Sequence, residues 1–287
     1  MSTEHLNHPL PVATAPDPLD DALAPLLAPA LAAALARQPG PQSRALRGRL
    51  LQRLAASREA EAVMFTARQR RLAAVPVAHG VTAQTLYQAQ PGVARRPGEP
   101  LLARLIRLDA GAVLEPELLG PDAPTRHREW LVLQGGVRIV LQRLSLRDYH
   151  VVPAGHAGEP WSTDTGALLF LRESDIPAQA GDAPFTVHDA QAGWPDFSPG
   201  IQRRVLWQRD GQAALLYYAQ PGAQVPHHTH GHDEECLMVQ GELFLDDLLL
   251  QPGDYQLAPA GTGHHLTATD TGVVIYAHGD TDLRFVA

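Results

Sequence analysis

Residues 222–265 contain the side chains of this chain that are best suited to chemistry. The stretch holds six of the fourteen histidines and the only cysteine. His228 and His230 are two residues apart, and Glu234 follows four residues after His230. Side chains two residues apart on a strand project to the same face, so these two imidazoles are expected to point in one direction. Together with Glu234 and His264, they would form a divalent-metal site suited to Zn, Fe, Mn or Ni.

A frame of glycine and proline residues surrounds these side chains. The first run contains Gly222, His228, His230, Glu234 and Gly241. The second run contains Gly253, Pro259, Gly261 and His264. The alternative is a solvated histidine-rich loop made by His227, His228, His230 and His232. That alternative leaves both His264 and the glycine frame without an explanation.

Several neighbours of these residues have two interpretations each. Cys236 shares the strand parity of Glu234, so it is either a small buried hydrophobe or a redox-active thiol with a lowered pKa beside the metal. His232 and His265 are either exposed loop histidines or residues that contact the metal ligands or transfer protons near them. Glu235 has the opposite parity and is expected to face away from the metal.

Composition limits the class of protein. The chain has 287 residues, of which 45% are hydrophobic and 19% charged, as in soluble globular proteins. A net charge of −8 gives no electrostatic reason to expect nucleic-acid or membrane binding. A single cysteine excludes an intramolecular disulfide. The N-terminus lacks the pattern of a secretion signal, and the apolar run at 22–36 is too short to span a bilayer, which predicts a cytoplasmic protein.

Two helices are predicted before the rest of the chain changes to short β-like runs at about residue 63. One covers Ala22–Arg37, and the other runs from Ser43, a good N-cap residue, to about Ala60. Leu46, Leu50 and Leu54 form an apolar stripe on the second helix. Its remaining faces carry Arg44, Arg47, Arg49, Arg53 and Arg58, which are either solvated or bind a partner.

The β-like region contains an internal repeat. FTAR at 65–68 resembles FTVH at 185–188, and GVTAQTLYQ at 80–88 resembles GIQRRVLWQ at 200–208, both 120 residues apart. LVLQG at 131–135, DYHVVPAG at 148–155 and TDTGALLF at 163–170 each recur 106 residues later. The chain therefore carries a tandem duplication, with about fourteen extra residues between Gln88 and Arg128 in the first copy.

The two copies are chemically unequal. Arg128 takes the place of Glu234, and Gly158 takes the place of His264. The first-copy positions that correspond to His228 and His230 are Glu117 and Leu119, or Asp122 and Pro124, depending on where the extra residues lie. A fixed positive charge opposes a bound cation, so the first copy is expected to be free of metal. Its expected role is to pack against the second copy or to hold an anion near Arg128. The alternative is an unconventional metal site, because His127, His150 and His156 lie nearby.

The two spaced runs resemble the two signature motifs of the cupin superfamily, and residues 228–265 resemble the cupin part of ChrR-type anti-sigma regulators. The resemblance implies a mainly β fold with two tandem jelly-roll barrels after a short helical segment. The expected division is 1–62 for the helical segment, 63–180 for the degenerate first cupin and 181–287 for the metal-binding second cupin. The resemblance also implies zinc on His228, His230, Glu234 and His264. The family's N-terminal zinc site needs a Cys-x-x-Cys pair, which this chain lacks.

Two functional classes follow from these features. The first is a regulator that responds to a small molecule or an oxidant and has an extracytoplasmic-function sigma factor as partner. The second is a metal-dependent cupin enzyme of the dioxygenase type. A homodimer is compatible with either class. Tyr217, Tyr218, Gln224, Tyr255 and Gln256 are the residues that would line a cavity beside the metal.

Overall fold

The computed structural model describes residues 41–93 and 95–286. The predicted second helix is present as α2 (Pro41–Val63), which begins two residues before Ser43 and ends three residues after Ala60. Three of its leucines, Leu46, Leu50 and Leu51, are exposed by half or more of their surface. The helix predicted at Ala22–Arg37 lies outside the described residues. No helix among the described residues has the length and apolar character needed to cross a membrane.

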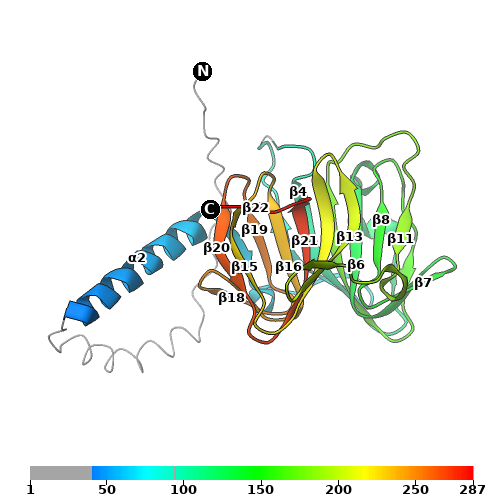
Figure 1. The fold of residues 1–287 in the computed structure, drawn as a ribbon. Coiled ribbons are helices and arrows are strands. Elements are labelled where there is room, and N and C mark those ends of the chain that lie inside the picture. The colour runs from blue at the N-terminus through cyan, green and yellow to red at the C-terminus, as the bar shows by residue number, and fades with distance from the viewer. Residues whose placement is uncertain (1–40, 94, 287) are drawn as a thin grey trace, which may run out of the picture. The chain divides into compact units, whose positions relative to one another are not determined.

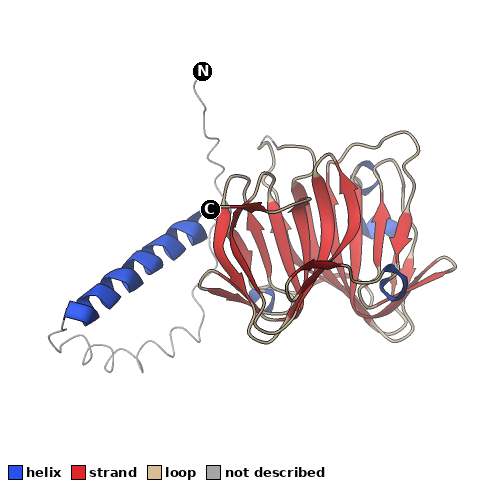
Figure 2. Cartoon of the chain, viewed as in Figure 1, coloured by secondary structure: helices blue, strands red, loops and turns tan. Residues whose placement is uncertain are grey.

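Strands make up most of the remaining chain (Figure 2). The first copy contains β1 (Phe65–Ala67), β2 (Val75–Ala78), β3 (Val81–Gln88), β4 (Pro100–Leu108), β5 (Val113–Leu114), β6 (His127–Ile139), β7 (Gln142–Ser145), β8 (Tyr149–Val152), β9 (Trp161–Ser162) and β10 (Ala167–Ser174). The second copy contains β11 (Phe185–Val187), β12 (Asp196–Ser198), β13 (Ile201–Arg209), β14 (Gln212–Ala219), β15 (Gln224–Thr229), β16 (Glu234–Gly241), β17 (Leu243–Leu245), β18 (Leu248–Leu250), β19 (Tyr255–Ala258), β20 (Gly263–Ala268), β21 (Val273–Asp280) and β22 (Arg284–Phe285). Short helices lie between them: η1 (Gln69–Arg71), η2 (Pro116–Leu119), η3 (Ala123–Thr125) and α3 (Asp189–Ala192).

These strands form two barrels, each closed by antiparallel sheets (Figure 1). The first barrel is built on a sheet in the order β11-β8-β6-β10-β4-β3-β2, to which β5, β7 and β9 are joined. The second barrel has a sheet in the order β1-β19-β16-β21-β14-β13-β12 and a facing sheet in the order β18-β17-β20-β15-β22. Alternating burial along the first residues of β3 directs Val81 and Ala83 inward, as expected for a strand with one solvated face, whereas most of β4 is buried. The expected architecture of two jelly-roll barrels is confirmed.

Strand register confirms the internal repeat and locates its extra residues. Leu108 of β4 pairs with Ala167 of β10, as Ala219 of β14 pairs with Val273 of β21. Some extra residues therefore lie in the loop between β3 and β4. The rest follow β5, where η2 and η3 replace the end of the strand that carries the histidine pair in the second copy. Glu117 and Leu119 lie in η2, whereas Asp122 and Pro124 lie at η3, so neither alternative places a histidine pair in the first barrel.

The two copies exchange their first strands. β11, which begins the second copy, pairs with β8 of the first barrel, and β1, which begins the first copy, belongs to the sheet of the second barrel. Two equivalent buried aspartates anchor the exchanged segments. Asp148 accepts a hydrogen bond of 2.7 Å from the backbone N–H of Asp189. Asp254 accepts one of 2.9 Å from that of Gln69. The barrels are thus joined by main-chain pairing as well as by side-chain packing.

A buried polar network lies between the barrels and is centred on Arg172. Its guanidinium donates to Glu129 of the first barrel at 2.9 Å and to Glu235 of the second barrel. Each carboxylate also accepts a hydrogen bond of 2.6 Å from a tyrosine, Tyr149 for Glu129 and Tyr255 for Glu235. All five residues are at most 1% exposed. Glu235 therefore faces away from the predicted metal site, as its strand parity predicts, and has a structural role in this network together with its counterpart Glu129.

Candidate metal centre

Three strands of the second barrel position the predicted ligands. His228 lies in β15, His230 directly follows that strand, and Glu234 begins β16. β15 pairs antiparallel with β20, and this pairing places His264 opposite His228. His228, His230 and His264 are each at most 3% exposed, so the expected common face of the histidine pair points into the barrel. Two motifs that are separate in the sequence therefore meet at one site.

Backbone contacts hold this arrangement. Gly263 is needed at the start of β20 because a Cβ atom there would lie 2.1 Å from the carbonyl oxygen of His228. His230 donates its backbone N–H to Thr262 at 2.9 Å and accepts from the N–H of Gly261 at 2.7 Å. The Pro-x-Gly-x-x-His part of the second motif thus forms the turn that supports the histidine pair.

The four predicted ligands lie together, and three of them form the tightest group. His228, His230 and Glu234 offer donor atoms that all lie within 4.8 Å of one another. Nε2 of His230 lies 3.3 Å from Oε2 of Glu234. The ring of His264 is adjacent, with its centroid 5.3 Å from that of His230 and 5.7 Å from that of His228. Among the described residues, this is the only group of at least three His, Cys, Asp or Glu side chains with donor atoms so close together.

The protonation states of these groups fit a metal site. Burial lowers the pKa of His228 and brings that of His230 to about 4, so both imidazoles are neutral, as metal ligands must be. Burial raises the pKa of Glu234, against the opposite effects of His264 and His228. A buried carboxylate of this kind is stabilised by a nearby cation.

The hydrogen bonds of the imidazoles also leave donor atoms for a metal. Nδ1 of His228 donates to the carbonyl oxygen of Pro226 at 2.9 Å, which keeps the lone pair on Nε2. Nε2 of His230 and both ring nitrogens of His264 are buried and have no hydrogen-bond partner within the protein. Buried polar atoms without partners are rare, and a divalent cation would satisfy Nε2 of His230 and one ring nitrogen of His264. The residues therefore fit a metal ion.

A small cavity of about 60 Å³ adjoins this cluster inside the second barrel. Its walls are mainly aliphatic, and His228, Glu234 and His264 are among its few polar lining residues. Of the five residues expected to line it, Tyr217 does. Tyr255 instead donates to Glu235 in the network between the barrels, and Gln256 contacts Thr66. Tyr218 and Gln224 are exposed. The face to which a strand residue points depends on register, so the sequence alone did not show which of these five residues line the cavity.

Cys236 lines the same cavity, as its parity predicts. Burial raises the pKa of its thiol well above the ordinary value, and the carboxylates of Glu234 and Glu235 raise it further. The cause is that the thiol is surrounded by apolar groups and negative charge, which favours the small-hydrophobe interpretation over the redox-active thiol. The small-hydrophobe interpretation agrees with its burial at 5% exposure.

The other two flanking histidines differ in their surroundings. His232 hydrogen-bonds through Nδ1 to Asp280 at 2.5 Å, and Asp280 also accepts from the backbone N–H of Gly231. His232 therefore supports the loop after His230 indirectly. His265 is 63% exposed along its side chain and stacks on His227, with ring centroids 4.6 Å apart. It points away from the cluster.

Asp246 is a residue of the site that sequence reasoning missed. It occupies the tip of the β17–β18 hairpin, and its Oδ2 lies 3.8 Å from Nδ1 of His264. Its Oδ1 accepts hydrogen bonds from the backbone N–H groups of His265 at 2.8 Å and Leu266 at 3.0 Å. A carboxylate beside a ligand imidazole orients the ring. The only sequence feature that marks Asp246 is the Asp-Asp pair between two leucine-rich strands. Such a pair is also typical of an ordinary turn.

Comparisons with known proteins agree with this geometry. Residues 182–282 match the family model of the ChrR Cupin-like domain. A solved oxalate decarboxylase from Lactobacillus farciminis, in a formate complex, is 13% identical over 78% of this chain and 88% of its own, with a TM-score of 0.54. The chain has the cupin fold, and residues 182–282 are similar to the ChrR Cupin-like domain.

Two further cupin-fold structures are similar at comparable levels. A bacterial pirin from Escherichia coli in complex with nickel(II) is 10% identical over 75% of this chain and 98% of its own, with a TM-score of 0.53. An oxalate decarboxylase from Bacillus subtilis, described for its Mn(II) centres, is 15% identical over 78% of each chain, with a TM-score of 0.53. At these identities the likeness establishes the fold alone. No curated protein matches the chain.

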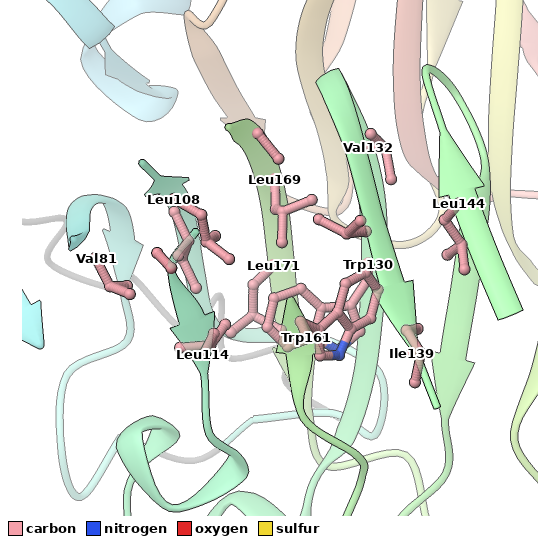
Figure 3. Close-up of a cluster of buried hydrophobic side chains, with 14 of the residues drawn as sticks. Val81, Leu108, Leu114, Trp130, Val132, Ile139, Leu144, Trp161, Leu169 and Leu171 are labelled. Carbon is pink, nitrogen blue, oxygen red and sulfur yellow. The ribbon is translucent and has the colours of Figure 1, made fainter. Parts of the chain in front are cut away.

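The first cupin barrel has a packed interior where the second has its cavity. Trp130 and Trp161 are the counterparts of Cys236 and Thr267, and their rings lie 4.7 Å apart inside the barrel (Figure 3). Their neighbours form one buried cluster with Val81, Leu108, Leu114, Val132, Ile139, Leu144, Leu169 and Leu171. Two indoles therefore take the space that lies beside the candidate metal ligands in the second barrel.

The histidines near Arg128 do not converge on a site in the first barrel. His127 packs against Trp207 of the second barrel, with ring centroids 5.1 Å apart. Nδ1 of His150 lies 2.8 Å from the hydroxyl of Thr186, and His156 lies near the carbonyl of Asp182. Among the described residues, these histidines belong to no metal-like group.

Proposed function

We propose that the second cupin barrel binds one divalent metal ion through His228, His230, Glu234 and His264, with zinc as the expected metal. The three buried imidazoles and the carboxylate come from three strands of a rigid barrel. Nitrogen and carboxylate ligands of this kind suit Zn, Fe, Mn and Ni. Four protein ligands in a closed, largely apolar setting are typical of zinc sites that stabilise or sense.

We further propose that the protein is a metal-dependent regulator that responds to a small neutral molecule or an oxidant. The observation that supports this is the size of the cavity, about 60 Å³. Ligand pockets of enzymes usually measure about 300–1,000 Å³, whereas holding one water molecule takes about 10–15 Å³ of comparable volume. Molecules of the size of dioxygen or hydrogen peroxide fit such a space, and most organic substrates do not.

The partner expected from the ChrR-like match is an extracytoplasmic-function sigma factor. The match to the ChrR Cupin-like domain supports a regulatory role. The exposed leucines of α2 (Leu46, Leu50 and Leu51) offer apolar surface for such a partner. A cytoplasmic location accompanies this proposal.

An enzyme that uses the same ligands is the alternative, and Tyr217 is the observation in its favour. Its phenol lines the cavity, and burial together with Glu234 raises its pKa, so it remains a proton donor. The lining of the cavity disfavours carboxylate substrates such as oxalate, because it includes no Lys or Arg. Four protein ligands with no water would support the regulator, and open positions filled by water would support the enzyme.

Metal analysis of protein purified without a chelating tag tests the site. One equivalent of divalent metal per chain is expected, and X-ray absorption spectroscopy should report three imidazoles and one carboxylate. His264→Ala and Glu234→Gln should lose the metal, while the exposed control His265→Ala should retain it. Full occupancy in both site variants would contradict the assignment. Co-purification with a sigma factor, abolished by Leu46→Asp in α2, tests the regulatory part separately.

A further inference from the structure

A second pocket lies where the two copies meet, and it is larger than the cavity beside the candidate metal ligands. Its volume is about 390 Å³, against about 60 Å³ for that cavity. Small-molecule sites usually measure about 300–1,000 Å³. One wall is the loop between β3 and β4, and the other walls are the segment after β10 and the β13–β14 hairpin. A small organic molecule therefore has room here that it does not have beside the candidate ligands.

Contacts with both copies fix the β3–β4 loop, which holds some of the extra residues of the first copy. The side-chain amide of Gln212 donates to the carbonyl oxygen of Pro97 at 3.0 Å. Gly98 donates its backbone N–H to Asp175 at 3.1 Å, and its carbonyl oxygen accepts from the buried guanidinium of Arg172 at 2.5 Å. Gly98 has a φ of 93°, a conformation that favours glycine. The loop thus forms a fixed wall of the pocket.

The indole of Trp207 gives the pocket an apolar surface. Trp207 is 8% exposed, and its ring lies against the buried imidazoles of His127, with ring centroids 5.1 Å apart, and of His278, with ring centroids 5.7 Å apart. The ring planes of Trp207 and His278 are 20° apart, so these two rings stack. This packing holds the indole in place at the edge of the pocket. Three further residues extend the apolar surface: Pro97, Ile176 and Pro177.

Two guanidinium groups line the pocket next to this apolar surface. Arg209 is fixed by hydrogen bonds to Asp182 at 2.6 Å and to the carbonyl oxygen of Pro177 at 3.1 Å. Arg96 comes from the β3–β4 loop, and within the described part of the chain no carboxylate pairs with its side chain. The lining contains one carboxylate, Asp210, which is exposed at a turn. The guanidinium of Arg96 is therefore available to an anionic group of a ligand.

We propose that this pocket binds a small organic carboxylate with an apolar body, with Arg96 as the partner of its carboxylate. A guanidinium and a carboxylate form two parallel hydrogen bonds, which orient the ligand, and the surface around Trp207 covers its apolar part. The cavity beside the candidate metal ligands has no Lys or Arg in its lining, so the two sites suit different ligands. This proposal goes beyond the proposed function and requires no metal.

Isothermal titration calorimetry of the full chain with benzoate tests the proposal. The wild type should bind one benzoate with a dissociation constant of about 1 mM or lower, and benzamide, its neutral analogue, should bind at least about 10-fold more weakly. Arg96→Met should also weaken benzoate binding by about 10-fold or more, because charged hydrogen bonds are lost. Asp210→Asn should tighten it, because a negative charge is removed from the lining. Arg143→Met, at an exposed arginine of β7, is the matched control and should bind benzoate as the wild type does.

Two further measurements locate the bound benzoate. Tryptophan fluorescence should change when benzoate is added to the wild type, and the change should be smaller in Trp207→Phe, which keeps an aromatic ring. Protein from which a chelator has removed metal should bind benzoate with unchanged affinity. Binding that disappears with the metal would overturn the proposal, because benzoate would then be a metal ligand in the second barrel. A wild type that binds no benzoate, or equal affinities of the wild type and Arg96→Met, would overturn it as well.

Discussion

Arg128 and Glu234 occupy equivalent positions in the two barrels and bring opposite charges to the same place. Arg128 pairs with Val152 across the β6–β8 ladder, as Glu234 pairs with Ala258 across β16–β19. The guanidinium of Arg128 donates to the carbonyl oxygens of Ala157 at 3.0 Å and of His156. The first barrel thus has a positively charged guanidinium at the position where the second barrel has Glu234, a candidate ligand for a metal ion.

Replacing Arg128 by methionine should destabilise the protein. Arg128 is 1% exposed, and its loss removes its hydrogen bonds to the carbonyl groups of His156 and Ala157. Hydrogen bonds to charged groups contribute about 1.5–3 kcal/mol, so the free energy of unfolding should fall by about 2 kcal/mol. Urea denaturation measures this. Arg138→Met, at an exposed ion pair with Asp164, is the matched control and should change stability by less than about 0.5 kcal/mol. Equal effects of the two substitutions would contradict the assigned role.

Removing the shared guanidinium between the barrels should have a larger effect. Arg172→Met leaves the carboxylates of Glu129 and Glu235 buried without their cation. Breaking a buried ion pair from one side costs about 3–5 kcal/mol. Adding Glu129→Gln and Glu235→Gln to Arg172→Met should recover part of this loss, because the uncompensated charge is removed. Thermal unfolding of the single and triple variants tests the coupling, and a triple variant less stable than Arg172→Met would refute it.

Stability should fall between about pH 6.5 and pH 4 because of His127. Burial lowers its pKa from 6.5 to about 4, partly opposed by Glu129. The unfolded chain therefore binds more protons in this interval, so the stability is fully present above pH 6.5 and is lost as the pH falls toward 4. A shift of this size corresponds to about 3 kcal/mol.

His127→Phe tests this dependence, because it keeps an aromatic ring against Trp207 and removes the titration. Its unfolding free energy should depend less steeply on pH in that interval, by about one proton. His150, whose pKa burial also lowers to about 4, contributes with the same sign and accounts for a residual slope. His265→Phe, at an exposed histidine, should leave the slope unchanged. An unaltered slope in His127→Phe would count against the prediction.

The Cys236 thiol should be unreactive in the native protein. Its burial and raised pKa disfavour the thiolate, which is the reactive form. A disulfide reagent at neutral pH should label no thiol until denaturant is added, and then should label one per chain. An added surface cysteine, as in Leu141→Cys, is the positive control and should react at once. Rapid native labelling of Cys236 would restore the redox interpretation.

Asp246 should support metal binding without being a ligand. Its carboxylate lies 3.8 Å from Nδ1 of His264 and fixes the backbone of the next two residues. Loss of such a supporting group typically weakens metal binding about 10–100-fold, so Asp246→Asn should show a loss of that size in chelator competition. Asp247→Asn, at the neighbouring exposed residue, should bind metal as the wild type does. Equal affinities of all three proteins would exclude the supporting role.

The sequence by itself determined the repeat, the two-barrel fold and the ligand candidates. Similar sequence segments that recur at constant spacing show the duplication directly. Strand parity correctly placed His228 and His230 on one face and turned Glu235 away from Glu234, because the side-chain period of a strand is independent of distant contacts. The replacement of two candidate ligands in the first copy, by Arg128 and Gly158, was also readable from the sequence.

Tertiary structure decided the features that depend on contacts between distant segments. These include the exchange of first strands, the sharing of Arg172 between two carboxylates, and the size of the cavity beside Glu234. The approach of Asp246 to His264 and the exposure of Leu141 were likewise visible only in the structure. Each depends on which side chains meet across strands far apart in the chain, and local spacing carries no information about that. Residue types and their spacing thus determined the candidate ligands, whereas packing determined the space and the charge around them.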